Sequence, residues 1–279
     1  MTPAPARGSF FWRLVAALAI VANIGMSYYS NARKFNGQSM GEVSAKYSTL
    51  LTPAGYAFSI WGLIYLSLVI YAVWQLLPAQ RNNPLPDAVA KSLALANVAS
   101  AAWVVIFAHE QILLSVLTML VLLAATAYTY GTARDMVRAQ NVAPRWVSIP
   151  FALLLGWVCV ATVLNVSLGL HVAGIGVSGS TPENLAFLML GVLIVLILVL
   201  ARAFQERTLP LVAGWALVAV WTARVSAYPV LGWTALSGAV VVVILGLVLA
   251  QQGRKLQPWE VSAAAAAAAE AEARSKAVS

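Results

Sequence analysis

The residues best suited to do chemistry in this chain lie in one apolar stretch, between Trp157 and Asn165. Trp157, Ala161 and Asn165 are spaced four residues apart, so they share one face if the stretch is helical. An indole, a methyl group and a carboxamide in this order leave a hollow opposite Ala161. A flat aromatic ligand could stack there, with the amide as its polar anchor. The alternative is a helix crossing, in which Ala161 admits a neighbouring helix closely.

Tryptophans form the second set of candidates. Half of the ten lie near the ends of apolar stretches, where aromatic belts anchor helices in the headgroup region: Trp12, Trp74, Trp146, Trp233 and Trp259. The other half lie deeper, where an indole N–H needs a partner inside the protein: Trp61, Trp103, Trp157, Trp215 and Trp221. These either pack between helices or line a cavity. Tyr65 follows Trp61 by four residues, so the two share a helical face.

Ionisable candidates are few. His109 and Glu110 could relay protons at membrane depth, but a hairpin tip exposed to water is the favoured interpretation. Arg224 is expected to extend to the membrane interface, and pairing with a ligand carboxylate is the alternative. Cys159 is the single cysteine, and His109 and His171 fall on different loops. We therefore predict no catalytic residue, no metal site and no haem-ligating cofactor.

The elements that must position these residues are apolar helices. Only 9% of the 279 residues are charged, and the apolar stretches are continuous rather than alternating. A bilayer core takes roughly 20 helical residues to cross. We predict an all-α, polytopic membrane bundle with about eight transmembrane helices, of which the third and seventh are short. The spans are 10–30, 54–77, 91–108, 112–133, 146–170, 182–204, 209–226 and 229–250.

The connections suggest three parts: 1–175 with five spans, 176–252 with three, and an Ala-rich tail, 253–279. The segment Asn31–Pro53 is the longest polar connection, and a loop of that length is often a lid or a binding element. The 78–91 segment is interpreted as a plain connector.

The net charge of +8 reflects topology rather than nucleic-acid binding. With the spans in alternation, Arg33, Lys34, Lys46 and Arg224 are the only ones of the 17 Lys and Arg residues on one side. The excess on the other side predicts an inner-membrane protein with both termini in the cytoplasm.

Three segments resemble the translocator-protein family, known in bacteria as TspO, the tryptophan-rich sensory proteins. Pro53 stands eight residues before Trp61, and Tyr65 follows four residues later, as in the family's second helix. Ser100-Ala101-Ala102-Trp103 resembles its third-helix Asn-x-x-Trp. The run Trp157-Val158-x-x-Ala161-x-x-Leu164-Asn165 is similar to its fifth-helix signature. The resemblance covers about residues 10–170.

The sequence also departs from the family pattern. The double proline of the family's first loop is reduced to Pro53, and Phe58 is one position nearer Trp61 than usual. Pro150-Phe151 replaces a proline-tyrosine pair, and the spans in 182–250 have no counterpart in the five-helix form. The resemblance implies a hydrophobic ligand, a tetrapyrrole (a porphyrin) or a sterol-like molecule.

We therefore predict a ligand-binding membrane protein for sensing or transport, more readily a binder than an enzyme. The predicted ligand-binding residues are Trp61, Tyr65, Trp103, Trp157, Ala161 and Asn165. The expected partners are the lipid bilayer and a hydrophobic small molecule, without nucleic acid; a homodimer is left open. The alternatives are a secondary transporter using His109 and Glu110 for coupling, and an intramembrane enzyme acting on lipid or porphyrin.

The charge asymmetry makes the topology testable. A reporter fused after Ser279 should be active only if it works in the cytoplasm, because most basic residues lie on that side. Paired fluorescent-protein and alkaline-phosphatase fusions measure this. An active phosphatase fusion would mean that the span count or the orientation is wrong.

Overall fold

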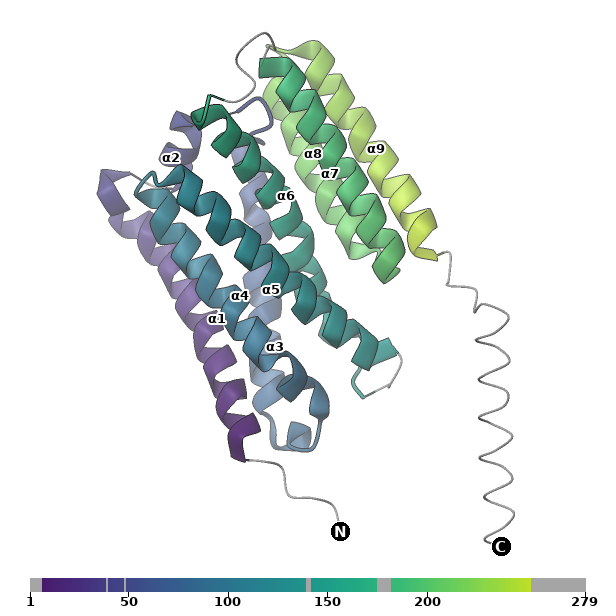
Figure 1. Cartoon of the computed structure of the whole chain (residues 1–279). Helices are drawn as coiled ribbons and strands as arrows, with labels where there is room; N and C mark the ends of the chain where they lie inside the picture. Colours follow the sequence, from purple (N-terminus) through teal and green to yellow (C-terminus); the bar gives the residue numbers. More distant parts are fainter. Residues whose placement is uncertain (1–6, 39, 48, 139–141, 175–181, 252–279) are drawn as a thin grey trace, which may run out of the picture.

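The chain folds into a bundle of long helices without a strand in the part that the structure, a computed structural model, describes (Figure 1). This part comprises residues 7–38, 40–47, 49–138, 142–174 and 182–251. The long helices are α1 (Arg7–Arg33), α3 (Ile60–Leu76), α4 (Pro84–Ala108), α5 (Ile112–Arg138), α6 (Ile149–Val172), α7 (Pro182–Phe204), α8 (Thr208–Arg224) and α9 (Pro229–Gln251). The short helices are α2 (Met40–Lys46) and the 3-10 helices η1 (Phe35–Gly37), η2 (Gly55–Ser59), η3 (Pro78–Gln80) and η4 (Arg145–Ser148).

The helices confirm a polytopic helical membrane protein. Among the described residues, 7 helical segments are long and apolar enough to cross a membrane, and η2 and α3 together form one of them. The 17-residue α8 is shorter, as predicted for the seventh span. In Figure 1, α1 begins and α9 ends on the same side of the bundle. The 253–279 tail and the boundary at 175/176 lie outside the described residues.

The third span begins earlier than predicted. Helix α4 starts at Pro84 rather than at residue 91 and has 25 residues, so it is not short. The Asn83 side chain accepts a hydrogen bond from the Leu85 N–H and caps the helix. Pro84 and Pro86 fall in the first turn, where a missing N–H leaves no bond unmade. The predicted connector 78–91 is therefore half helix.

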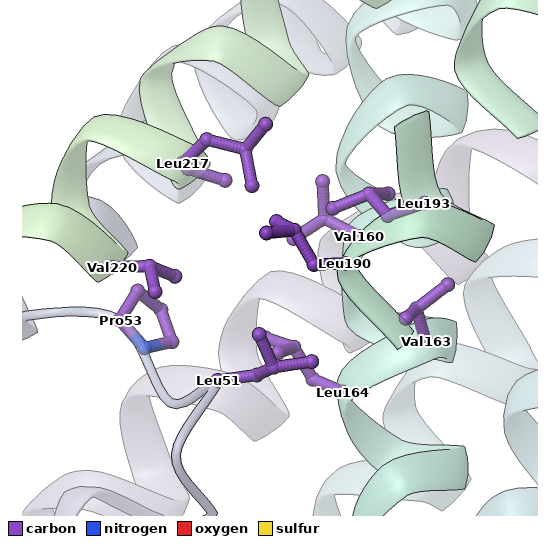
Figure 2. A pocket seen from close by; sticks show the side chains of 10 residues that line it. Leu51, Pro53, Val160, Val163, Leu164, Leu190, Leu193, Leu217 and Val220 are labelled. Atoms are coloured by element: carbon purple, nitrogen blue, oxygen red, sulfur yellow. The ribbon is translucent and has the colours of Figure 1, made fainter. Parts of the chain in front are cut away.

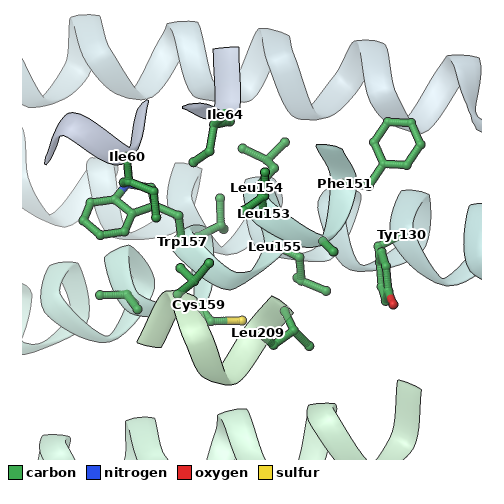
Figure 3. Close-up of a cluster of buried hydrophobic side chains, with 14 of the residues drawn as sticks. Ile60, Ile64, Tyr130, Phe151, Leu153, Leu154, Leu155, Trp157, Cys159 and Leu209 are labelled. Carbon is green, nitrogen blue, oxygen red and sulfur yellow. The ribbon is translucent and has the colours of Figure 1, made fainter. Parts of the chain in front are cut away.

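Helix α6 is the centre of the bundle. It packs against α3, α5, α7 and α8, and 72% of its most apolar window is buried. Its own side chains are apolar on every face rather than on one stripe, which is typical of a helix that is buried among other helices. Figure 3 shows Leu153, Leu154, Leu155 and Trp157 of α6 amid side chains from neighbouring helices.

Glycines allow the last three helices to pack closely against α6 and against one another. A Cβ added to Gly156 of α6 would stand 3.1 Å from Val212 Cβ of α8. Within the C-terminal group, a Cβ on Gly246 of α9 would stand 2.5 Å from Pro210 Cβ. Close backbone approach is the usual source of packing energy between helices in lipid. Helices α7–α9 thus form one group that packs on α6 through α7 and α8.

The turn between α7 and α8 is held by the end of α5. Arg134 donates to the Phe204 carbonyl, and Arg138 donates to the Gln205 carbonyl at 2.9 Å. Glu206 accepts a hydrogen bond from the Tyr130 hydroxyl at 2.5 Å. Burial opposes ionisation of Glu206, yet hydrogen bonds from Tyr130 and Thr208 outweigh it and hold its pKa below the ordinary value.

The start of α1 is fixed by a buried cation. The Arg13 side chain is 3% exposed and forms an ion pair with Asp87 of α4. It also donates to the Gln80 carbonyl at 2.7 Å and to the Asn83 carbonyl at 2.9 Å. One guanidinium therefore joins α1 to the connection between α3 and α4.

Arg13→Met should lower the free energy of unfolding by about 3 kcal/mol, because it leaves Asp87 and two carbonyls without their donor. This value is at the low end of the cost of removing one partner from a buried ion pair, because the Asp87 side chain is 32% exposed and can be hydrated. Arg81→Met is the matched control, because Arg81 is exposed; its effect should stay within about 0.5 kcal/mol. Detergent-induced unfolding measures both. Equal losses would contradict this role for Arg13.

Candidate functional site

A cavity of about 800 Å³ lies among the first five spans and the segment that joins the first two. Its volume falls in the range of pockets for drug-sized ligands. The lining comes from α1, α2, α3, α4, α5, α6 and the residues around η2. The residues are Ser27, Tyr28, Asn31, Gly41, Ser44, Tyr47, Thr49, Thr52, Pro53, Gly55, Phe58, Ser59, Trp61, Gly62, Tyr65, Ser100, Trp103, Val104, Phe107, Met119, Leu122, Trp157, Val158, Ala161, Leu164, Asn165 and Leu168.

All the residues predicted to bind a ligand line this one cavity: Trp61, Tyr65, Trp103, Trp157, Ala161 and Asn165. The four-residue spacing brings Trp157, Ala161 and Asn165 to the same wall, as a helix requires. The structure thus brings the predicted set together. Their role in ligand binding stays a prediction.

Aromatic rings build one side of the cavity. Trp61 and Tyr65 stack with centroids 5.1 Å apart and planes at 29°. Trp157 meets Trp61 edge to face at 6.3 Å and Phe58 at 5.9 Å. Edge-to-face and offset pairs are the favoured aromatic arrangements. Trp157 is only 1% exposed, so it supports the other rings more than it faces the hollow.

Two nitrogen donors of the lining, the Asn165 amide and the Trp103 indole, have no acceptor among the described residues. Ser115 of α5 donates to Asn165 Oδ1 at 3.1 Å, while Asn165 Nδ2 has no protein acceptor. Trp103 Nε1 is buried and also lacks an acceptor. The Tyr65 hydroxyl, by contrast, is bonded to Ser27 Oγ at 2.7 Å. The polar part of the site therefore favours a ligand that offers acceptors.

The cavity lining described here contains no Asp, Glu, Lys, Arg, His or Cys. Moving a charge out of water without a partner is costly. The interior of this cavity therefore suits an uncharged molecule. The polar side chains present are hydroxyls, amides and indoles, which can orient a ligand without binding a metal ion.

His109 and Glu110 lie at the tip between α4 and α5, outside the lining. Glu110 accepts hydrogen bonds from Lys46 Nζ at 2.6 Å, from Gln38 Nε2 at 2.9 Å and from the Tyr47 hydroxyl. Exposed His109 lies beside Phe35, and its Nδ1 is 2.8 Å from the Val105 carbonyl. The structure therefore places neither His109 nor Glu110 beside the six predicted ligand-binding residues that line the cavity.

Hydrogen bonds to the charged form control the ionisation of Glu110. Those from Lys46 and Tyr47 lower its pKa from 4.5 to about 2. The same contacts raise the pKa of Lys46 and of Tyr47. Glu110 has a φ of 59°, a left-handed conformation that is uncommon for a residue with a side chain. Glu110 is thus a fixed anion that holds the α2 segment against the α4–α5 tip.

Arg224 bonds backbone carbonyls of the segment between the first two spans, and its predicted extension to the membrane interface stays a prediction. The guanidinium at the end of α8 donates to the Leu50 and Thr49 carbonyls, both at 2.9 Å, and to the Thr52 carbonyl at 3.2 Å. A desolvated cation satisfies itself with carbonyl dipoles where no carboxylate is near. Arg224 is absent from the cavity lining, whereas Thr49 and Thr52 belong to it.

Sequence reasoning missed the lining residues of α1, α2 and α5. Ser27 and Asn31 are spaced four residues apart near the end of α1, a polar stripe that could have indicated a shared face. Met119 and Leu122 of α5 carry no signal, because apolar residues are expected everywhere in a span. The long connection after α1 was interpreted as a lid or binding element, and Tyr47, Thr49 and Thr52 come from it.

A second, much smaller crevice lies between α6, α7, α8 and the segment that contains Leu51 and Pro53 (Figure 2). It holds about 10 Å³ and is lined by apolar side chains such as Val160, Leu190 and Leu217. A water molecule needs at least that space and several polar partners. The crevice is therefore a packing gap rather than a site.

Comparison with known proteins identifies one family. The family model described as TSPO-like protein matches residues 13–248. The match extends beyond residues 10–170, where the motifs lie, and includes α7, α8 and α9. No curated protein and no solved structure matches the chain significantly.

The low pKa of Glu110 predicts its charge at each pH. Since the folded pKa lies below 4.5, its contacts are at full strength above pH 4.5 and weaken as the pH falls toward 2. Infrared difference spectra of wild type against Glu110→Gln should therefore show a constant carboxylate band from about pH 8 to 5. A band that titrates within this range would restore Glu110 as a proton relay.

Proposed function

The chain belongs to the TSPO-like protein family, and from this premise we propose that it binds a flat hydrophobic molecule in the tryptophan-lined cavity, for sensing or transport. In this proposal it resides in the inner membrane with both termini in the cytoplasm. The observation that carries the proposal is the position of the six predicted residues around one cavity of about 800 Å³.

The chemistry of the lining supports an uncharged ligand core. Trp61 and Tyr65 offer a stacked aromatic surface, and Asn165 Nδ2 and Trp103 Nε1 offer donors. A sterol-like molecule or the ring of a tetrapyrrole matches this set. The carboxylates of a tetrapyrrole would have to remain outside the described lining, since no basic side chain belongs to it.

Proton-coupled transport has weaker support. Glu110 is tied to Lys46 and Tyr47 and has a pKa of about 2, so it does not exchange protons near neutral pH. Because a relay needs a group that titrates at the working pH, we favour binding over an ion-driven cycle.

Filling the hollow should remove binding. Ala161→Phe places a ring where the ligand would stack, so the affinity for protoporphyrin dimethyl ester should fall at least about tenfold, or by about 1.4 kcal/mol. The matched control is Ala124→Phe, on the exposed face of α5 away from the cavity. Quenching of tryptophan fluorescence measures binding. Equal affinities for wild type and Ala161→Phe would place the ligand on another surface.

Removing the amide should have a smaller effect. Asn165→Leu removes one donor, and a hydrogen bond in a membrane site is typically worth ~0.6–2 kcal/mol. Ser115 keeps its bond to the Ile112 carbonyl at 2.7 Å, so the substitution leaves no new unpaired hydroxyl.

The ligand class is tested on the wild-type protein, by comparing the binding of protoporphyrin, its dimethyl ester and a sterol. If none binds, the ligand class is wrong although the fold and the family stand.

A further inference from the structure

One part of the cavity lining is a segment that α8 also contacts. We call residues 49–57 the rim segment. It begins with a tight turn, in which the Thr52 N–H donates to the Thr49 carbonyl at 3.0 Å and Thr52 Oγ1 accepts from the Thr49 N–H at 3.0 Å. Thr49, Thr52, Pro53 and Gly55 of this segment line the cavity.

Helix α8 contacts the rim segment along one face. Trp215 Nε1 donates to the Ala57 carbonyl at 3.1 Å, and the Ala219 carbonyl accepts from the Ala54 N–H at 2.9 Å. Thr222 Oγ1 donates to the Tyr56 hydroxyl at 3.4 Å, and residues 215, 219 and 222 are spaced as one helical stripe. The ring of Tyr56 packs edge to face on Trp215 at 5.2 Å. The whole rim segment therefore lies along the second half of α8, from Trp215 to Arg224.

Arg224 completes this attachment at the end of α8. Its guanidinium bonds the carbonyls of Thr49, Leu50 and Thr52 and has no carboxylate partner among the described residues. Hydrogen bonds from a charged donor are stronger than neutral ones. Its planar fork can bond several acceptors at once, which a lysine ammonium does less well. Three of the four carbonyls of the turn thus accept hydrogen bonds from a single side chain.

We infer that Arg224 is a positioning residue for the ligand cavity, and that α8 serves to hold the rim segment closed over it. This inference rests on the proposed function. Arg224 itself does not line the cavity, and it acts through Thr49 and Thr52, which do. In this inference, a bound molecule leaves past the rim segment, which must first detach from α8. Loss of the attachment should therefore raise the dissociation rate without lowering the association rate.

The test uses the full chain in lipid nanodiscs and two readouts. Hydrogen exchange of peptides covering residues 49–57 reports the attachment without any ligand, because the Ala54 N–H is bonded to Ala219. Stopped-flow fluorescence with protoporphyrin dimethyl ester reports association and dissociation. The variants are Arg224→Met, Arg224→Lys and, should Arg224→Met fail to fold, Trp215→Phe, which keeps a ring but loses the N–H. Arg202→Met is the matched control, since Arg202 is exposed at the end of α7.

We expect Arg224→Met to increase exchange in the rim segment at least about tenfold and to speed dissociation by a similar factor. Arg224→Lys should recover part of both effects, Trp215→Phe should change exchange mainly near Ala57, and Arg202→Met should change neither.

Unchanged exchange in both Arg224→Met and Trp215→Phe would overturn the inference, as would faster exchange with unchanged dissociation. If wild type binds no ester, the proposed ligand fails, and exchange alone then decides whether α8 holds the rim.

Discussion

Every polar group at membrane depth must find its partner inside the protein, and this constraint governs the arrangement around α6. Because α6 is enclosed by other helices, most of its polar groups must find partners within the protein. Thr162 satisfies itself on the Val158 carbonyl within the helix. The Asn165 side-chain carbonyl accepts a hydrogen bond from Ser115. Its amide nitrogen has no acceptor among the described residues. Asn165 lines the cavity, as does Trp103, whose buried Nε1 also has no partner among the described residues.

The same constraint explains how two groups of helices are joined. Arg134 and Arg138 of α5 bond the carbonyls that end α7, which have no partner within their own helix. A cation also interacts favourably with the negative end of the helix dipole. On the other side of the bundle, Arg224 of α8 bonds carbonyls of the 49–52 turn. Arginines of the first five spans thus bond carbonyls next to α7, and an arginine of α8 bonds carbonyls between the first two spans.

Local patterns predicted most of the fold, because a lipid environment requires continuous apolar runs of fixed length. The start of α4 was misplaced, since Pro84 and Pro86 suggest a loop but also suit the first helical turn. Spacing of four residues predicted the shared wall of Trp157, Ala161 and Asn165, because helix geometry alone determines it. The contacts of Glu110 with Lys46 and of Arg224 with Thr49 could not be predicted. They join distant segments, and no local pattern records such a pairing.

The bond between Arg224 and the Leu50 carbonyl spans 174 positions of the chain, and this separation has a consequence for biosynthesis. A ribosome delivers the N-terminal helices first. All six aromatic, small and amide side chains of the cavity are therefore in the membrane before α8 has been made. Until then the 49–52 turn lacks the cation that bonds its carbonyls. The attachment of the rim segment to α8 is therefore among the last contacts next to the cavity to form during synthesis.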